Sequence, residues 1–274
     1  MSRKTTYIVV EGHHDVEFIG AVLRNGPRAF HREEFKSKVE EFWYPLIPKS
    51  YATGKHPKDH LGRVPMPIFF QNDTHTVAVQ SAEGISNIVK RLEETLAAAG
   101  FAEPDAIGLV LDSDSNETPA LRAATLAQEL AREAPHLQGA FPAVPGTVVT
   151  ATSPGISRRG VFVFPDNASQ GTLEDLLLEC GRLSYQALLG LAEAHVDAAK
   201  AKLIPSSSNW TKDDHKEFKA PSGLKKATIA SATAILKPGK TSQVSVSDNR
   251  WVETETLALP KVKAVADWLE ALIF

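Results

Sequence analysis

Short apolar runs alternate along the chain with longer stretches in which apolar residues recur every three or four positions. Four runs rich in β-branched and aromatic residues predict buried strands, at residues 6–10, 76–79, 106–111 and 161–164. Stretches with helical spacing follow them, beginning near His14, Ile85, Thr118 and Leu173. This alternation predicts an α/β fold with a mostly parallel sheet and helices on both of its faces.

Two segments depart from this alternation. Residues 27–75 are irregular, with a helix expected only around residues 33–42, and we interpret the segment as an insertion because such long loops are uncommon in compact domains. After residue 183 no further strand is expected, and helices are predicted over residues 185–200, 225–236 and 262–273. We therefore predict an α/β domain over residues 1–183 and a mainly helical C-terminal extension over residues 184–274, packed on the same domain.

Composition limits the class of partner and the compartment. The 274 residues carry a formal net charge of −3, so a nucleic acid would be bound by a local basic patch or through metal ions. The single cysteine, Cys180, lies in an apolar helical stretch, which predicts a buried thiol and a reducing compartment. There is no signal-peptide pattern and no run near the roughly 20 apolar residues that span a bilayer. We expect a cytoplasmic protein with no membrane partner.

Acidic residues stand where two of the predicted strands end. Glu11 follows the first strand, with Asp15 one helical turn later, and Asp112 and Asp114 follow the third. Because parallel strands end at one edge of a sheet, we expect these carboxylates to gather there. Crowded carboxylates repel one another unless a cation binds, and oxygen ligands favour Mg²⁺ or Mn²⁺. For Asp114 above all, an ordinary role in a turn or helix cap remains the alternative.

The order of these motifs resembles the Toprim family. Residues 11–15, Glu-Gly-x-x-Asp, resemble its first motif, and Asp112-x-Asp114 resembles its second. Residues 171–174, Gly-Thr-Leu-Glu, resemble a turn of the stand-alone and overcoming-lysogenization-defect nucleases of that family. The resemblance covers about residues 5–180, apart from the insertion. It implies a Toprim-like sheet and Glu174 as a ligand of a second metal ion, although an acid is favoured in the first turn of any helix.

The resemblance also implies a lysine late in the chain that neutralises charge near the scissile phosphate. Lys225 and Lys226 stand where it would be expected, and Lys226 is preferred, with a solvated helix start as the alternative. The predicted metal ligands are therefore Glu11, Asp15, Asp112, Asp114 and Glu174, and the predicted catalytic residues are Glu11, Asp112, Asp114 and Lys226. Glu11 would double as general acid or base. His13 and His14 could shuttle protons, although exposed histidines at a helix start are commoner.

These features predict a Mg²⁺-dependent nuclease of DNA or RNA, which the resemblance would place in phage defence or nucleic-acid processing. One alternative is a non-catalytic Toprim-like module that binds metal or a nucleotide within a larger complex, and another is a nucleotidyl transferase of the primase kind. The chain has no Walker motif, so an ATP-driven activity would come from a separate ATPase or effector protein.

Nucleic-acid contacts are expected from basic residues outside the acidic motifs, namely Lys49, Lys55, Lys58, Arg63, Arg158, Arg159 and Lys225. In the insertion these cations stand near aromatic residues such as Tyr51, and together they could follow a phosphate backbone. A solvated loop is the alternative. We expect the insertion to lie beside the acidic site and the two arginines to add positive charge to its rim.

Overall fold

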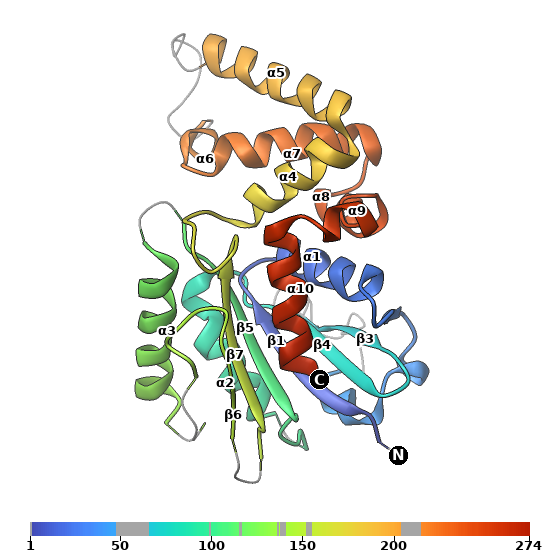
Figure 1. Ribbon diagram of the computed structural model, residues 1–274, viewed down its shortest axis with the longest axis vertical. Coiled ribbons are helices and arrows are strands. Elements are labelled where there is room, and N and C mark those ends of the chain that lie inside the picture. The colour runs from blue at the N-terminus through green and yellow to red at the C-terminus, as the bar shows by residue number, and fades with distance from the viewer. Residues whose placement is uncertain are drawn as a thin grey trace, which may run out of the picture.

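The computed structural model describes residues 2–47, 66–98, 100–114, 117–135, 137, 141–151, 155–203 and 215–274. Within these residues the strands form one seven-stranded sheet in the order β2-β3-β4-β1-β5-β7-β6 (Figure 1). Its parallel centre comprises β4 (His75–Ser81), β1 (Lys4–Val10), β5 (Ala106–Asp112) and β7 (Arg158–Phe164). The antiparallel margins are β2 (His31–Glu33), β3 (Ile68–Gln71) and β6 (Val148–Thr150). The predicted α/β class is confirmed.

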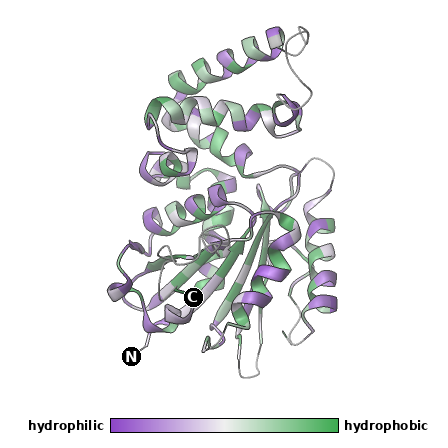
Figure 2. Ribbon diagram, turned by 180° about the vertical axis from the view of Figure 1, so that it is seen from behind, coloured by the Kyte–Doolittle hydropathy of each residue, from purple (hydrophilic) through white to green (hydrophobic). Residues whose placement is uncertain are grey.

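Helices cover both faces of this sheet. One face carries α1 (His13–Asn25) and α10 (Pro260–Ile273), and the other carries α2 (Ile88–Leu96) and α3 (Pro119–Glu133) (Figure 1). Successive residues of β1 divide between the two cores, Ile8 and Val10 on the α1 side and Tyr7 and Val9 on the α2 side, because side chains alternate along a strand. The strands are accordingly hydrophobic in Figure 2, whereas α3 shows both hydrophilic and hydrophobic residues.

A group of helices lies over the end of the sheet where the parallel strands finish (Figure 1). It contains α4 (Leu173–Ser184), α5 (Gln186–Leu203), α6 (Lys216–Lys219), α7 (Gly223–Leu236), α8 (Ser242–Asp248) and α9 (Thr254–Leu257). The chain then returns to the sheet, where Trp268 and Leu272 of α10 lie over Gly108 of β5. Residues of the extension and of the sheet belong to one hydrophobic core cluster, and the domain division at residue 183 stays a prediction. None of the described helices is long and apolar enough to cross a membrane.

The described part of the insertion extends the sheet. It supplies β2 and β3, followed in space by β4, and two short 3₁₀ helices, η1 (Lys36–Lys38) and η2 (Glu41–Leu46). The helix predicted around residues 33–42 is therefore wrong. Trp43 gives the physical reason, because its indole is fully buried, donates to the Thr76 hydroxyl at 2.9 Å and packs beside the Phe42 ring. Anchoring this aromatic residue on the sheet decides the local conformation.

Candidate metal site at the carboxyl edge of the sheet

Glu11 and Asp112 lie side by side where β1 and β5 end. Val10 pairs with Val110, and the Asp112 backbone N–H donates to Glu11 Oε2 at 3.4 Å. The turn after β4 fixes the backbone at Glu11, because the Gly84 N–H donates to the Glu11 carbonyl at 3.0 Å. The predicted convergence of the first and second acidic motifs on one edge of the sheet is confirmed.

Asp15 faces the same edge from the first turn of α1. Its side chain is 5% exposed, and its Oδ2 accepts a hydrogen bond from the Gly12 N–H at 2.6 Å, so it also caps the helix. Burial raises the pKa of Asp15 to about 8, and the charges of Glu11 and Glu174 add to this shift. The metal-free protein thus resists ionisation of this carboxyl.

Asp112 is subject to the same influences. Burial raises its pKa well above the ordinary value, and Asp15, Glu11 and Glu174 raise it further, although the Leu173 N–H donates to its Oδ1 at 2.9 Å. Burial also raises the pKa of Glu11. Carboxyls that follow β1 or belong to α1, β5 and α4 therefore act on one another within a single site.

The middle residue of the Asp-Ser-Asp sequence fastens the start of α4 to the end of β5. Ser113 is fully buried; its hydroxyl accepts from the Gly171 N–H at 2.8 Å, and its own N–H donates to the Gly171 carbonyl at 3.1 Å. Gly171 has a φ of 153°, and a Cβ there would lie 2.6 Å from Asp175 Oδ2. This junction brings the Leu173 N–H to Asp112.

The same junction sets the first turn of α4. Thr172 stands at the N-cap, and Asp175 completes the cap by accepting from the Thr172 N–H at 3.0 Å. Glu174, which follows the cap, is buried, and its charge acts on both Asp15 and Asp112. Glu174 therefore lies within electrostatic reach of Asp15 and Asp112, and its role as a metal ligand stays a prediction.

Asp114 stands at the margin of the cluster. Its side chain is 49% exposed, and its backbone has a φ of 56°, in the left-handed region that turn-forming aspartates tolerate. Its Oδ2 lies 3.3 Å from Nη2 of Arg122, a residue of α3 that sequence analysis did not single out. The Asp114 charge still contributes to raising the pKa of Glu11. Asp114 is thus both a turn residue and a neighbour of the site.

The two late lysines have different surroundings. Lys226 acts on the cluster, because its charge lowers the pKa of both Glu11 and Asp15 against the larger effect of burial. Lys225 instead pairs with Asp175, with Nζ 2.7 Å from Oδ1. Of the two lysines, Lys226 is thus the one whose charge acts on Glu11 and Asp15, and its role beside a scissile phosphate stays a prediction.

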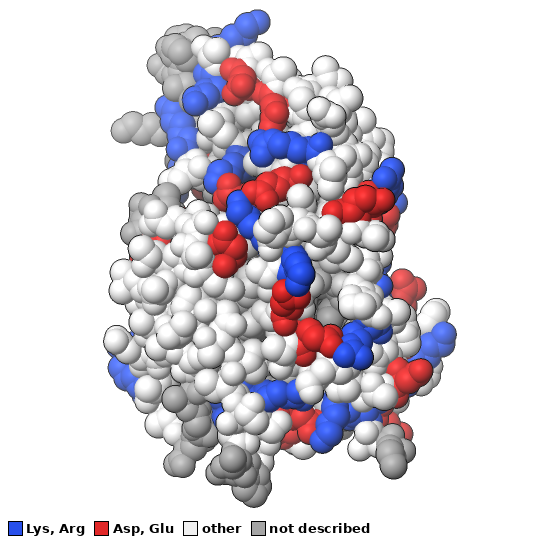
Figure 3. Space-filling model, viewed as in Figure 1, with Lys and Arg blue, Asp and Glu red and all other residues white. Residues whose placement is uncertain are grey.

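Two of the other predicted nucleic-acid residues are not brought to this edge. Arg158 and Arg159 begin β7, whose register pairs Ala106 with Arg158 and Asp112 with Phe164, so both arginines lie at the opposite end of the sheet. The expectation that they add charge to the rim is wrong. Lys49, Lys55, Lys58 and Arg63 lie outside the described residues. On the face shown in Figure 3, the described Lys and Arg residues are interspersed with Asp and Glu.

The two histidines that follow Glu11 differ in their exposure. His13 is exposed, with Nε2 3.5 Å from Glu83 Oε1. His14 is partly buried, and burial lowers its pKa even though the nearby Glu174 charge raises it. A neutral His14 imidazole thus lies within electrostatic reach of Glu174, which makes it the histidine that faces the cluster.

In the part of the chain that the structure describes, no three His, Cys, Asp or Glu side chains stand ready to hold a metal ion. The contacts above give a reason, because Asp15, Asp112 and Glu11 are each turned toward a backbone N–H. The donors are nevertheless all carboxylate oxygens, the ligands that Mg²⁺ and Mn²⁺ prefer. The residues fit such an ion chemically, because each of these carboxylates accepts its backbone N–H through one oxygen and keeps a second oxygen as a ligand.

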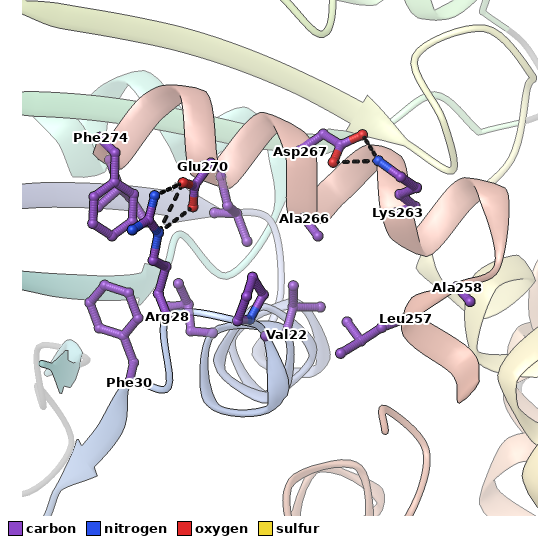
Figure 4. Close-up of a pocket in the computed structure, with 15 residues that line it drawn as sticks. Val22, Arg28, Phe30, Leu257, Ala258, Lys263, Ala266, Asp267, Glu270 and Phe274 are labelled. Atoms are coloured by element: carbon purple, nitrogen blue, oxygen red, sulfur yellow. Dashed lines mark hydrogen bonds and ion pairs between the residues drawn. The ribbon is translucent and has the colours of Figure 1, made fainter. Parts of the chain in front are cut away.

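An apolar pocket of about 470 Å³ lies elsewhere, between α1, α9 and α10 (Figure 4). Its rim carries the ion pairs Arg28–Glu270 and Lys263–Asp267, the second with Nζ 2.7 Å from Oδ1. Because these charges are paired with one another, the pocket offers apolar surface rather than polar groups that could position a reacting substrate.

The fold and the site define an α/β protein with a carboxylate cluster at the carboxyl edge of its parallel strands. The chain belongs to the family described as "Protein of unknown function (DUF3226)", whose model matches residues 5–274. It is similar to the crystal structure of hypothetical protein PH0156 from Pyrococcus horikoshii OT3, with a TM-score of 0.45, 16% identity, and coverage of 98% of this chain and 95% of that chain. No curated protein matches it. The resemblance to the Toprim family stays a prediction.

Proposed function

We propose that this protein is a Mg²⁺- or Mn²⁺-dependent phosphodiesterase that hydrolyses DNA or RNA. The observation that supports this is the gathering of Glu11, Asp15, Asp112 and Glu174, carboxyls from four separate elements whose charges act on one another. Buried like charges destabilise a folded protein unless a cation or protons compensate them. A cluster of this kind is expected where a protein binds divalent cations.

The proposed ligands are these carboxyls together with Asp114. When bound, such ions supply an activated water and a counter-charge for the departing oxygen. Glu11 would exchange a proton at Oε1 or Oε2, and the raised pKa of this carboxyl supports the role because it brings titration closer to neutral pH. Lys226 would offset the negative charge of the phosphate beside the cluster.

The same edge would also suit a non-catalytic module that binds a metal ion or a nucleotide within a larger complex. The observation that favours it is that Asp15 and Asp112 each accept a backbone N–H, so both have structural roles that do not need a reaction. A role in phage defence, a separate ATPase or effector partner and a cytoplasmic location belong to the proposal through the family resemblance and the composition.

Cleavage assays separate these functions. Wild type, Asp112→Asn and a control, Asp197→Asn on the exposed face of α5, are incubated with plasmid, single-stranded DNA and RNA in Mg²⁺, Mn²⁺ or EDTA. We expect metal-dependent cleavage by wild type and control and its loss in Asp112→Asn. Full activity in Asp112→Asn would contradict the metal site. A wild type that binds Mn²⁺ but cleaves nothing would favour the binding module, and product formation only with nucleoside triphosphates would favour a transferase.

A further inference from the structure

Arg122 brings a cation from α3 to the acidic edge. Its side chain is 17% exposed and lies between two carboxylates, with Nη2 3.3 Å from Asp114 Oδ2 and Nε 3.1 Å from Glu117 Oε2. The Arg122 charge also lowers the pKa of Glu11, against the larger effect of burial, so the guanidinium lies within electrostatic reach of the end of β1. Arg122 thus stands beside the cluster, next to its most exposed carboxylate.

Both contacts of the guanidinium are loose. Charge-assisted N–H···O bonds are typically about 2.7–2.9 Å long, shorter than the distance to Asp114. The Nε contact with Glu117 has the distance of an ion pair, but Nε makes no hydrogen bond to the described residues. A partly buried guanidinium held in this way keeps donors that a better acceptor can satisfy.

A cation bound to Asp114 would compete with Arg122 for the negative charge of this carboxylate. If the carboxylate turns to the ion, Arg122 loses a partner beside the place where a substrate phosphate would lie. Its planar fork matches two oxygens of a phosphate, which the point charge of a lysine does not. We propose that Arg122 binds a phosphate group of the substrate. Until a divalent cation binds, the ion pair with Asp114 keeps Arg122 occupied. This inference rests on the proposed function.

Lys225 and Lys226 do not duplicate this role. Lys225 is already paired with Asp175 at 2.7 Å, in a cap that shapes the start of α4. The charge of Lys226 acts on Glu11 and Asp15, the carboxyls of β1 and α1. Arg122 approaches from α3, beside Asp114, so it would hold a phosphate from another direction.

Two binding measurements on the full chain test the proposal. Mn²⁺ affinity is obtained from the EPR signal of the free ion, and the affinity for inorganic phosphate in saturating Mg²⁺ from calorimetry. Arg122→Gln removes the competitor for Asp114, so Mn²⁺ should bind several-fold more tightly, whereas phosphate should bind about tenfold more weakly, the loss expected for one charge-assisted hydrogen bond. The control is Arg132→Gln, an exposed arginine on the same helix paired with Glu133, which should change neither affinity.

Arg122→Lys keeps the test usable if Arg122→Gln does not fold. It retains the charge but not the fork, so Mn²⁺ affinity should stay near wild type while phosphate binds several-fold more weakly. Weaker Mn²⁺ binding in Arg122→Gln, or unchanged phosphate binding in both variants, would overturn the proposal and leave Arg122 a structural residue. If wild type cleaves nucleic acid but phosphate affinity is the same in wild type and in the Arg122 variants, only this inference is overturned. Binding that responds as expected in a protein that cleaves nothing supports it and overturns only the proposed function.

Discussion

Asp112 combines a structural contact with an electrostatic cost. The Leu173 N–H donates to its Oδ1 at 2.9 Å, which ties α4 to β5, while burial and three neighbouring carboxyls raise its pKa. Its two possible roles, as the anchor of α4 and as a metal ligand, therefore meet in one side chain. Asparagine separates them, because it keeps an oxygen acceptor at the same place and removes the charge.

Asp112→Asn should leave the metal-free protein as stable as wild type or slightly more stable, because one of several mutually repelling carboxyls is gone. In Mg²⁺ the order should reverse, since an ion that binds only the folded state stabilises it and the variant binds it more weakly. Thermal unfolding of both proteins in EDTA and in Mg²⁺ measures this. If the free energy of unfolding of the variant is more than about 1 kcal/mol below that of wild type in EDTA, and the difference does not grow in Mg²⁺, Asp112 has a capping role alone.

Two features restrict substitution at Gly171, namely its positive φ and its contact with Asp175. Gly171→Ala forces a side chain into a φ of 153° and against Asp175, so we expect a loss of about 1–3 kcal/mol in the free energy of unfolding. Urea denaturation measures the loss. Gly239→Ala is the matched control, because it also has a positive φ, 75°, but no atom within 4 Å of the added Cβ. Equal losses in the two variants would mean that the contact with Asp175 contributes nothing.

At the scale of elements, the predictable part of the fold is its parallel centre. The apolar runs of β1, β4, β5 and β7 are buried on both faces, and a helix with a regular apolar stripe follows each of them, so pattern and structure coincide. The margins carry no such signal. β2 and β6 have three residues each, too few for a period to be recognised, and β3 has four.

The candidate site follows the same division. Glu11 and Asp112 could be placed together because both end parallel strands, and that rule should also have excluded Arg158, which begins one. Arg122 could not be anticipated, because its approach to Asp114 depends on how α3 packs against the rest of the fold. Residues fixed by strand direction were predictable from the sequence, and those fixed by helix packing were not.

At the other edge of the sheet, Asp105 fastens the start of β5 to β1. Its Oδ2 accepts from the Thr5 N–H at 2.8 Å; burial raises its pKa, but the hydrogen bonds from Thr5 and Lys4 outweigh this and hold the pKa below its ordinary value of 3.8. A group with a lowered pKa stabilises the fold above its unfolded pKa, and this contribution disappears as pH falls through the folded value.

Asp105→Asn should therefore cost about 1 kcal/mol at pH 7, a modest value because the carboxylate is partly exposed. The difference from wild type should shrink as the pH falls below about 4. Urea unfolding of both proteins from pH 7 down to the acid limit of the fold measures it. A difference that stays constant over this range would mean that the charge of Asp105 is not what stabilises the junction.

At the scale of the whole molecule, the last helix closes the sheet. Trp268 of α10 is almost fully buried over Gly108 and Gly160, so the centres of β5 and β7 depend on a segment far away in the sequence. The carboxylate cluster stands at the ends of β1 and β5, so one of the strands that Trp268 covers also carries the cluster. We expect the helical extension and the sheet to unfold together rather than as separate units.

Trp268→Ala should lower the free energy of unfolding by about 3–5 kcal/mol, because it leaves a large cavity between helix and sheet. Near- and far-ultraviolet circular dichroism should still report one coincident transition. The control is Leu191→Ala on α5, where the leucine is exposed, and a change within about 0.5 kcal/mol is expected. Two separate transitions in wild type would contradict a single cooperative unit.

The position of α10 in the chain also matters while the protein is being made. Glu11, Asp15, Asp112 and Asp114 leave the ribosome well before residues 260–273, which cover the sheet. Until that helix emerges, the nascent chain carries the carboxylates on a sheet whose centre is open to water. Translation products that stop before residue 260 should therefore be degraded by proteases instead of accumulating as partly active fragments.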